Sequence, residues 1–404
     1  MSGVYLILVL LNCPVFPVKG EKYMLNFSYN NPVTIHFGSD ALEKLPKEIK
    51  KYGKRVLLVY GRNSLKSSGN YEKITDVLIK NQISYVDFGG NVTPSYAKVL
   101  EAVKICKEEN VDMIISIGGS VCMDMAKVIA FGAKNDNLWD YLSGKLSPNH
   151  REMLHVGEIP TFPSGGSEVD AAAEIEDHER GARGSLYGKY PSFAILNPEL
   201  TYSVNQKETA YGAMVTFAQV FPHYFGGSSK IAEGFGETVM RTILVNVAIV
   251  LKNPSDYEAR SNLMWASAVN TLGILSCGKE RPWSLYGCET IEEEIFHVNY
   301  REAVAVLFPK WLRAVSKHYS DTVYNYAVRV MNVDANGKDK IQVVEEGIAA
   351  TESIYRQYGI AVTFNEIAEV PEKETILEAL KEFEDDDVLT REGVKDMILK
   401  CIKL

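Results

Sequence analysis

The chain has 404 residues, of which 46% are hydrophobic and 24% are charged, and its formal net charge is -9. This composition is that of a globular protein, and the length is sufficient for two sizeable cores. The interleaving of acidic and basic residues argues against a nucleic-acid-binding protein, because phosphate backbones require clustered Lys and Arg.

The chain begins with a short apolar segment, Val4 to Leu11. This segment is too short to span a bilayer as a helix, and we expect no other segment to do so. No Lys or Arg precedes it and no clear small-residue cleavage site follows it. We therefore interpret residues 1–23 as an N-terminal extension and expect a cytoplasmic protein without a membrane partner; a secretion signal is the alternative.

From Asn31 onward, short apolar runs alternate with stretches of helical periodicity. The predicted strands are 33–37, 55–60, 84–88, 112–117 and 155–162, and the predicted helices between them include 41–52, 71–81 and 96–109. This alternation predicts a parallel sheet covered by helices on both faces. In such sheets ligands bind beyond the carboxyl ends of the strands, so the turns after the apolar runs are candidate binding sites.

Three of these turns are rich in Gly and Ser: GRNSLKSSG, GGSVCMDMAK and PSGGSEVD. Phosphate favours such turns, because the backbone can approach closely and the N–H groups at a helix start face the negative charge. Gly118, Gly119 and Ser120 are the best candidates for holding a pyrophosphate. A purely steric role of Gly and Ser remains the alternative for each turn.

Beyond Val204 the sequence lacks strand-like runs and has long helical patterns. The predicted helices are 231–251, 255–275, 301–318, 321–331 and 340–358, followed by a charged pair after Pro371. We therefore predict a nucleotide-binding α/β domain at 24–206 and a helical domain at 207–404.

Six segments carry a resemblance to a known family: NNPVTIHFG, GGSVCMDMAK, GGSEVD, AILNPELTYSVNQKETAYG, NPSDYEARSNLMWASA and AVLFPKW. In this order they resemble the iron-containing alcohol dehydrogenases, in particular their butanol dehydrogenase-like branch. The resemblance implies a Rossmann-like nucleotide-binding α/β domain followed by an all-α domain, the dehydroquinate synthase-like architecture. It also implies NAD or NADP as cofactor and a divalent metal that polarises the alcohol or aldehyde oxygen during hydride transfer.

The resemblance implies a set of cofactor-binding residues at the three Gly/Ser turns. They are Gly61, Asn63, Ser64, Gly118, Gly119, Ser120, Asp124, Gly165, Gly166 and Ser167. Ile117 stands where the family usually has a glycine, and Gly165 where it usually has a threonine, so we expect weakened dinucleotide binding. For Asp124 and Lys127, capping and pairing within their own helix is the alternative.

The family takes its metal ligands from an Asp and a His four residues apart on one helix, and from two later His. In this chain the corresponding positions are Val215, Gln219, Tyr286 and Tyr300. Valine has no donor atom, a glutamine amide is a poor ligand for a transition metal, and a phenol with a pKa near ~10 must first lose its proton. We expect no bound metal and a degenerate or atypical oxidoreductase, a pseudoenzyme candidate that keeps a nucleotide-binding scaffold. Its expected partners are the nucleotide and a second subunit, as a homodimer or with a homologous dehydrogenase.

An active NAD(P)H-dependent alcohol or aldehyde oxidoreductase is the competing hypothesis. Tyr286 or Tyr300 could act as a general acid if a neighbouring arginine, Arg281 or Arg301, lowered its pKa. Alternatively, the metal could be held by His223, His297 and the carboxylates of 289–294. Pro222 argues against a relocated metal, because proline ends or kinks a helix and His223 then need not continue the original face.

Overall fold

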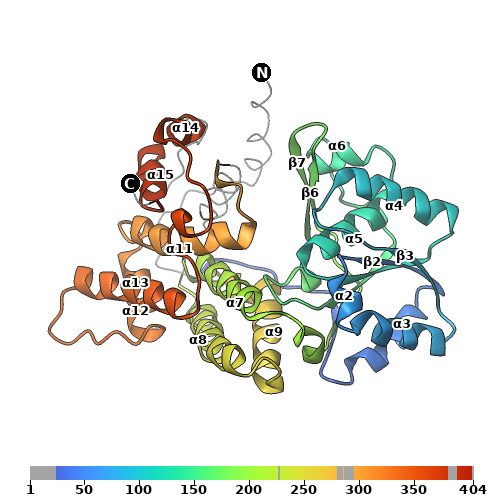
Figure 1. Cartoon of the computed structure of the whole chain (residues 1–404), viewed down its shortest axis with the longest axis horizontal. Helices are drawn as coiled ribbons and strands as arrows, with labels where there is room; N and C mark the ends of the chain where they lie inside the picture. The colour runs from blue at the N-terminus through green and yellow to red at the C-terminus, as the bar shows by residue number, and fades with distance from the viewer. Residues whose placement is uncertain (1–23, 226–227, 280–284, 286–294, 381–388, 403–404) are drawn as a thin grey trace. The chain divides into compact units, whose positions relative to one another are not determined.

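A computed structural model describes residues 24–225, 228–279, 285, 295–380 and 389–402 (Figure 1). Its contacts divide the chain into two compact units. Among the described residues, unit 1 comprises 30–204 and 255–272, whereas unit 2 comprises 24–29, 205–254 and the part after 273. The predicted division at 206 and 207 assigns helix α9 (Tyr257–Thr271) to the helical half, whereas its contacts group it with unit 1.

Unit 1 is built on a six-stranded sheet in which every neighbouring pair is parallel. The strand order is β1-β8-β5-β4-β2-β3. The strands are β1 Thr34–Phe37, β2 Arg55–Tyr60, β3 Ser84–Phe88, β4 Met113–Gly118, β5 His155–Pro160 and β8 Phe193–Leu196. The three central strands β5, β4 and β2 are almost entirely buried, which explains why they read as continuous apolar runs in the sequence.

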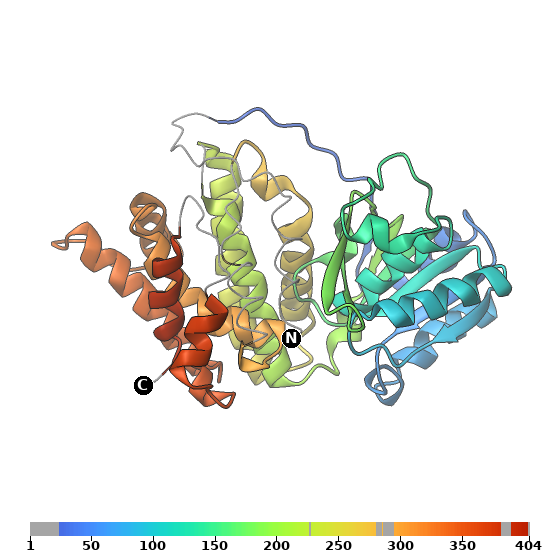
Figure 2. The ribbon, with the colours of Figure 1, turned by 90° about the horizontal axis from the view of Figure 1, so that it is seen from above.

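Helices cover both faces of this sheet, as predicted (Figure 2). The short helix α1 (Leu45–Ile49) and α3 (Asn70–Lys80) contribute to one apolar core. Helices α4 (Tyr96–Glu108) and α5 (Ser120–Gly132) contribute to the core on the other face. From Cys122 to Gly132, every residue of α5 except the half-buried Asp124 is buried, so this helix lies inside unit 1.

Two strand features were not predicted. An antiparallel hairpin joins β6 (Ala172–Asp177) to β7 (Ala182–Tyr187), and β8 inserts between β1 and β5. β8 is four residues long, as is the predicted β1, and it directly precedes the NPELT turn.

Unit 2 consists of helices around an aromatic core. They are α7 Gln206–Val220, η5 Phe221–Tyr224, α8 Lys230–Lys252, α11 Tyr300–Val315, α12 Ser320–Arg329, α13 Lys340–Gln357, α14 Lys373–Ala379 and α15 Arg391–Leu399. Phe221 makes edge contacts with Phe308, Trp311 and Tyr326 at ring-centroid distances of 5.6, 6.0 and 4.9 Å. These contacts join η5, α11 and α12 within one core.

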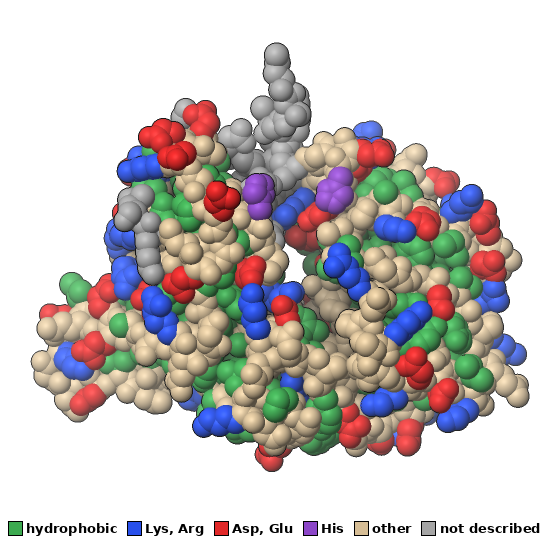
Figure 3. All heavy atoms as spheres, in the orientation of Figure 1, with side chains coloured by type: hydrophobic (Ala, Val, Ile, Leu, Met, Phe, Trp, Pro, Cys, Tyr) green, Lys and Arg blue, Asp and Glu red, His purple; other side chains and the backbone are tan. Residues whose placement is uncertain are grey.

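Helix α8 contradicts the expectation that no further segment is apolar enough to cross a membrane. Among the described residues it alone passes that test of length and composition, with a mean hydropathy of 1.5 over 18 residues. The test cannot separate a membrane span from a core helix, and α8 packs against α7 within unit 2. Elsewhere, on the face shown in Figure 3, acidic and basic side chains are interspersed.

Candidate functional site

The three Gly/Ser turns lie at the same edge of the unit 1 sheet. Each follows the carboxyl end of β2, β4 or β5, and these strands are parallel neighbours in the sheet. Residues that are far apart in the sequence therefore approach one another at the edge where ligands bind in sheets of this kind. This is the strongest geometric support for the predicted nucleotide site.

The first turn presents exposed side chains. Asn63 and Ser64 are exposed at the start of the short helix α2 (Ser64–Ser67). The carbonyl of Gly61 accepts a hydrogen bond from the backbone N–H of Gly90 at 2.9 Å, which ties this turn to the one after β3. The polar groups of Asn63 and Ser64 are thus accessible to a ligand.

The second turn connects β4 directly to α5. Gly118 has φ of +154°, and a Cβ added there would lie 2.9 Å from the Cys122 sulfur, so this position requires glycine. Gly119 is the N-cap of α5, so no side chain caps the helix start. Ile117, which stands where the family usually has a glycine, is buried in the core cluster that includes Ile115 and Ile159.

The third turn is held against helix α9. The backbone N–H of Gly165 donates to Ser267 Oγ at 3.1 Å, and Thr271 Oγ1 donates to the Gly166 carbonyl at 2.5 Å. A Cβ added at Gly166 would lie 2.3 Å from the carbonyl oxygen of Ser267. Both glycines therefore allow close packing of the turn on α9, a structural role that accompanies any ligand contact.

Asp124 and Lys127 make hydrogen bonds to the third turn, and their opposite charges also attract each other within α5. Asp124 accepts a hydrogen bond from Ser167 Oγ at 2.8 Å. The buried ammonium of Lys127 donates to the Ser167 carbonyl and to Asp170, both at 2.7 Å, and to the Ala172 carbonyl at 2.8 Å. These contacts fix the position of Ser167 relative to α5.

A buried acidic group that the sequence analysis overlooked lies next to this anchor. Glu158 is fully buried on β5 and accepts a short hydrogen bond from Ser116, its cross-strand neighbour on β4. Desolvation raises the pKa of Glu158 to about 8 and that of Glu168 and Asp124 to about 7. Its only signal in the sequence is one acidic residue within the apolar run HVGEIP.

The charge of Lys127 is opposed by burial and supported by its acidic neighbours. Desolvation lowers its pKa, whereas the charges of Asp170, Asp124 and Glu158 raise it, and the net direction is upward. Below about pH 7 the carboxyls of Glu158, Glu168 and Asp124 are therefore protonated, whereas the ammonium of Lys127 is charged. At higher pH these carboxyls ionise and add negative charge close to the sheet edge where phosphate is expected to bind.

In unit 2, two of the four positions that correspond to metal ligands are brought into contact. Gln219 Nε2, near the end of α7, donates a hydrogen bond to Tyr300 Oη, the first residue of α11, at 2.7 Å. Val215 lies one helical turn before Gln219 and is fully buried. Tyr286 lies outside the described residues.

The two histidines suggested for a relocated metal, His223 and His297, differ in their surroundings. Helix α7 ends at Val220, which confirms the effect predicted for Pro222. His223 is buried in η5 and shares a hydrogen bond of 2.5 Å with Ser276 Oγ, whereas His297 is exposed. Within the part of the chain that the structure describes, no three His, Cys, Asp or Glu side chains are placed to hold a metal ion. The carboxylates of 289–294 fall outside that part.

Arg301, suggested as the group that activates Tyr300, forms an ion pair with Glu208 at 2.8 Å. Glu208 lies in the first turn of α7, so this pair links α7 to α11. The negative charge of Glu208 partly offsets the positive charge of the Arg301 guanidinium near Tyr300. Arg281 lies outside the described residues.

Comparisons with known proteins agree with the observed fold. The family described as iron-containing alcohol dehydrogenase matches residues 32–198, and the C-terminal family of Fe-containing alcohol dehydrogenases matches residues 209–395. NADH-dependent butanol dehydrogenase A of Clostridium acetobutylicum is 33% identical over 356 residues, 85% of this chain and 90% of that protein. NADPH-dependent aldehyde reductase YqhD of Escherichia coli is 27% identical over 83% of this chain and 88% of that protein. The crystal structure of NADH-dependent butanol dehydrogenase A from Thermotoga maritima superposes with a TM-score of 0.86 at 26% identity, over 95% of this chain and 100% of that chain.

Proposed function

The chain belongs to the iron-containing alcohol dehydrogenase family, and from this premise we propose that it binds NADH or NADPH but has lost metal-dependent hydride transfer. The observation that carries the proposal is the hydrogen bond of 2.7 Å between Gln219 and Tyr300. It joins two neutral side chains at positions where the family places metal ligands.

The loss of the metal is supported by the chemistry of the donor atoms. Transition metals in such sites are held by neutral imidazole and carboxylate groups, which bind without a large cost of deprotonation. Val215 offers no donor, and the amide nitrogen of Gln219 donates a hydrogen bond to the phenol oxygen of Tyr300. An ion would have to break this hydrogen bond and gain only weak ligands in return.

Nucleotide binding is supported by the second turn. Gly118 and Gly119 leave the start of α5 without a Cβ or a capping side chain, so its N–H groups can meet a phosphate. Relatives named as NADH-dependent or NADPH-dependent indicate the cofactor class. In this proposal Asp124 and Lys127 position Ser167 beside the nucleotide.

The test measures metal content and nucleotide binding on the same preparation. Protein purified without chelator is incubated with ferrous iron, zinc, nickel or manganese, and bound metal is measured by elemental mass spectrometry. We expect well under one ion per chain, saturable binding of NADH or NADPH by fluorescence, and no oxidation of either with butyraldehyde. A stoichiometric ion together with enzyme-like turnover would overturn the proposal.

A matched variant restores two ligand types on α7. Val215→Asp with Gln219→His places a carboxylate and an imidazole four residues apart on one helix face. We expect measurable binding of zinc or iron in this double variant and not in Val215→Ala with Gln219→Ala. A stoichiometric ion in both the wild type and the alanine pair would indicate that the metal binds elsewhere.

A tyrosine acid in place of the metal is the second candidate function. It is favoured by one observation, that Gln219 holds the hydroxyl of the half-buried Tyr300 in a defined position. If Tyr300 donates a proton to a carbonyl substrate, Tyr300→Phe abolishes turnover while NADH binding persists. Under the main proposal, wild type and Tyr300→Phe show the same background rate.

A further inference from the structure

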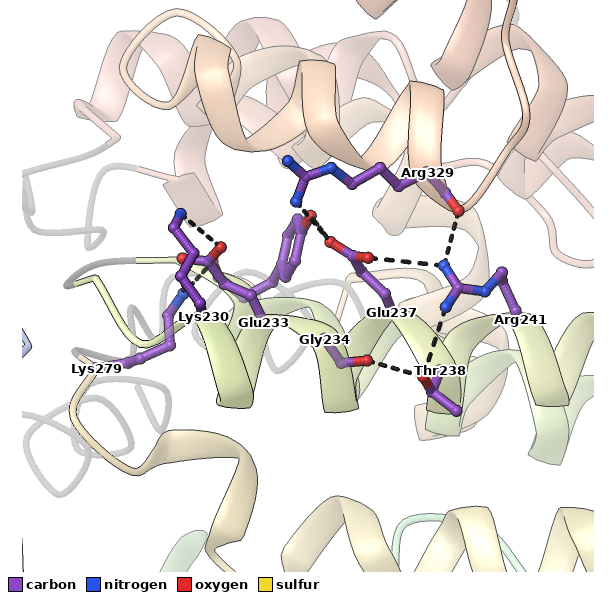
Figure 4. A network of polar contacts seen from close by, with 9 residues as sticks. Lys230, Glu233, Gly234, Glu237, Thr238, Arg241, Lys279 and Arg329 are labelled. Carbon is purple, nitrogen blue, oxygen red and sulfur yellow. Dashed lines mark hydrogen bonds and ion pairs between the residues drawn. The ribbon is translucent and has the colours of Figure 1, made fainter.

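The buried carboxyl of Glu158 lacks the polar contacts that the buried carboxyl of Glu237 has in unit 2. Glu237 Oε1 accepts a hydrogen bond from Arg329 at 3.1 Å, and its Oε2 pairs with Arg241 at 3.6 Å (Figure 4). Glu158 Oε2 accepts a hydrogen bond from Ser116, whereas its Oε1 is buried and has no hydrogen-bond partner among the described residues. Because a buried carboxylate with a single hydrogen bond is costly, this position favours the neutral acid.

The ammonium of Lys127 is bonded to the third turn rather than to Glu158. Helix α5, which carries Lys127, packs against both β5 and the third turn. Four oxygen atoms lie 2.7 to 3.0 Å from Lys127 Nζ, and they belong to Ser167, Asp170 and Ala172. An ammonium has only three N–H donors, so these oxygens occupy all of them.

The ionisable groups that interact most with Glu158 come from α5 and the third turn. They are Cys122, Asp124 and Lys127 on α5 and Glu168 in the third turn. The partners of Glu158 on the neighbouring strands, Ser116 on β4 and Ala194 on β8, carry no charge. Within this set Lys127 is the one cation, so it is the group that an ionised Glu158 attracts.

Ionisation of Glu158 makes it a competitor for this ammonium. Water screens buried charges only weakly, so an ionised Glu158 attracts Lys127 more strongly than an exposed carboxylate would. Lys127 can turn toward β5 only by giving up hydrogen bonds to the third turn, because all of its donors are in use. Ser167, which these bonds hold in place, then loses part of its support.

From these contacts we infer that Glu158 is a positioning residue of the nucleotide edge: in its neutral form it leaves Lys127 on the third turn, and in its ionised form it draws Lys127 away and weakens nucleotide binding. This role rests on the proposed function, because it requires a nucleotide at the third turn. Since burial raises the pKa of Glu158 to about 8, the change is expected between about pH 7 and pH 9. A purely structural role would make stability depend on pH and leave the affinity for nucleotide unchanged.

Fluorescence titration of the full-length chain with NADH and with NADPH, at pH 6.5 and pH 9, tests this role. In the wild type we expect the dissociation constant to rise by roughly fivefold or more between the two pH values. Glu158→Gln keeps a neutral side chain of similar size, so the dissociation constant should change by less than about twofold. Glu101→Gln, at an exposed residue of α4, is the matched control and should follow the wild type. Equal pH profiles for the wild type and Glu158→Gln would overturn the role of Glu158.

Hydrogen exchange measured by mass spectrometry tests the third turn without any nucleotide. After correction for the intrinsic effect of pH, the amides of residues 163–172 should lose protection between pH 6.5 and pH 9 in the wild type and keep it in Glu158→Gln. The peptide that covers α3, on the other face of the sheet, reports any general loss of stability. Absence of nucleotide binding at both pH values would contradict the proposed function, whereas unchanged protection of the third turn in the wild type would by itself overturn the role of Glu158.

Discussion

At Gln219 and Tyr300, two neutral side chains form a hydrogen bond at positions that the family resemblance assigns to metal ligands. At Glu158 an ionisable group is buried in a position where the sheet pattern favours an apolar residue. At the residue scale, unit 2 therefore has a neutral pair at these positions, and unit 1 has a buried titratable group.

The buried carboxyl of Glu158 makes the stability of unit 1 dependent on pH. Its pKa is raised from 4.5 to about 8 in the folded state, so the folded chain holds the proton more tightly than the unfolded chain. The free energy of unfolding is therefore expected to fall as pH rises from about 5 to about 8. Glu158→Gln should weaken this dependence, to which Glu168 and Asp124 also contribute, and stabilise the protein by roughly 1–3 kcal/mol at pH 8.

Urea denaturation at pH 5.5, 6.5, 7.5 and 8.5 measures this effect. Glu101→Gln is the control, because this substitution makes the same chemical change at a residue of α4 whose side chain is 53% exposed. Identical pH profiles for wild type and Glu158→Gln would show that Glu158 is ionised throughout, with Lys127 compensating its charge.

Among the elements, α5 and α9 determine the geometry of the nucleotide edge. Helix α5 supplies Asp124 and Lys127, which form hydrogen bonds with Ser167. Helix α9 supplies Ser267 and Thr271, which form hydrogen bonds with the backbone of the two glycines that precede Ser167. The conformation of the third turn therefore depends on both α5 and α9, which are more than 100 residues apart in the sequence.

The contact between the third turn and α9 predicts a large effect of a small substitution. Gly166→Ala places a Cβ 2.3 Å from the Ser267 carbonyl at φ of +85°, so both a steric clash and backbone strain result. We expect a loss of roughly 3 kcal/mol or more in the free energy of unfolding. Chemical denaturation monitored by circular dichroism measures it.

Gly69→Ala is the matched control for this substitution. Gly69 has a similar φ of +75°, but a Cβ added there meets nothing within 4 Å. It should cost only about 1–2 kcal/mol, from the backbone conformation alone. Equal losses for the two variants would mean that α9 moves to accommodate the methyl group at position 166.

For the whole molecule, two units with different tasks share one chain. Unit 1 carries the three turns at one sheet edge, and unit 2 carries Val215, Gln219 and Tyr300, the positions that the family resemblance assigns to metal ligands. The proposed function thus separates cofactor binding, assigned to unit 1, from metal binding, assigned to unit 2.

This separation predicts different responses to ligand and to chelator. NADH or NADPH at 100 times its dissociation constant should stabilise the protein by about 2.7 kcal/mol, whereas dialysis against EDTA should leave the melting temperature unchanged. Differential scanning calorimetry measures both. A clear destabilisation by EDTA that zinc or iron reverses would show a resident metal and contradict the loss of the site.

The sequence by itself determined the strands β1 to β5 and the helical second half, because period-two and period-3.6 patterns are local properties. The family followed from six segments that resemble the iron-containing alcohol dehydrogenases. It also determined that α7 ends before Pro222, since proline acts on its own helix. Only the tertiary structure decided that β8 lies between β1 and β5, that α9 groups with unit 1 and that Lys127 binds the third turn. The contact of Gln219 with Tyr300 likewise joins residues 81 positions apart. Such pairings depend on how distant elements pack, and no local pattern in the chain encodes them.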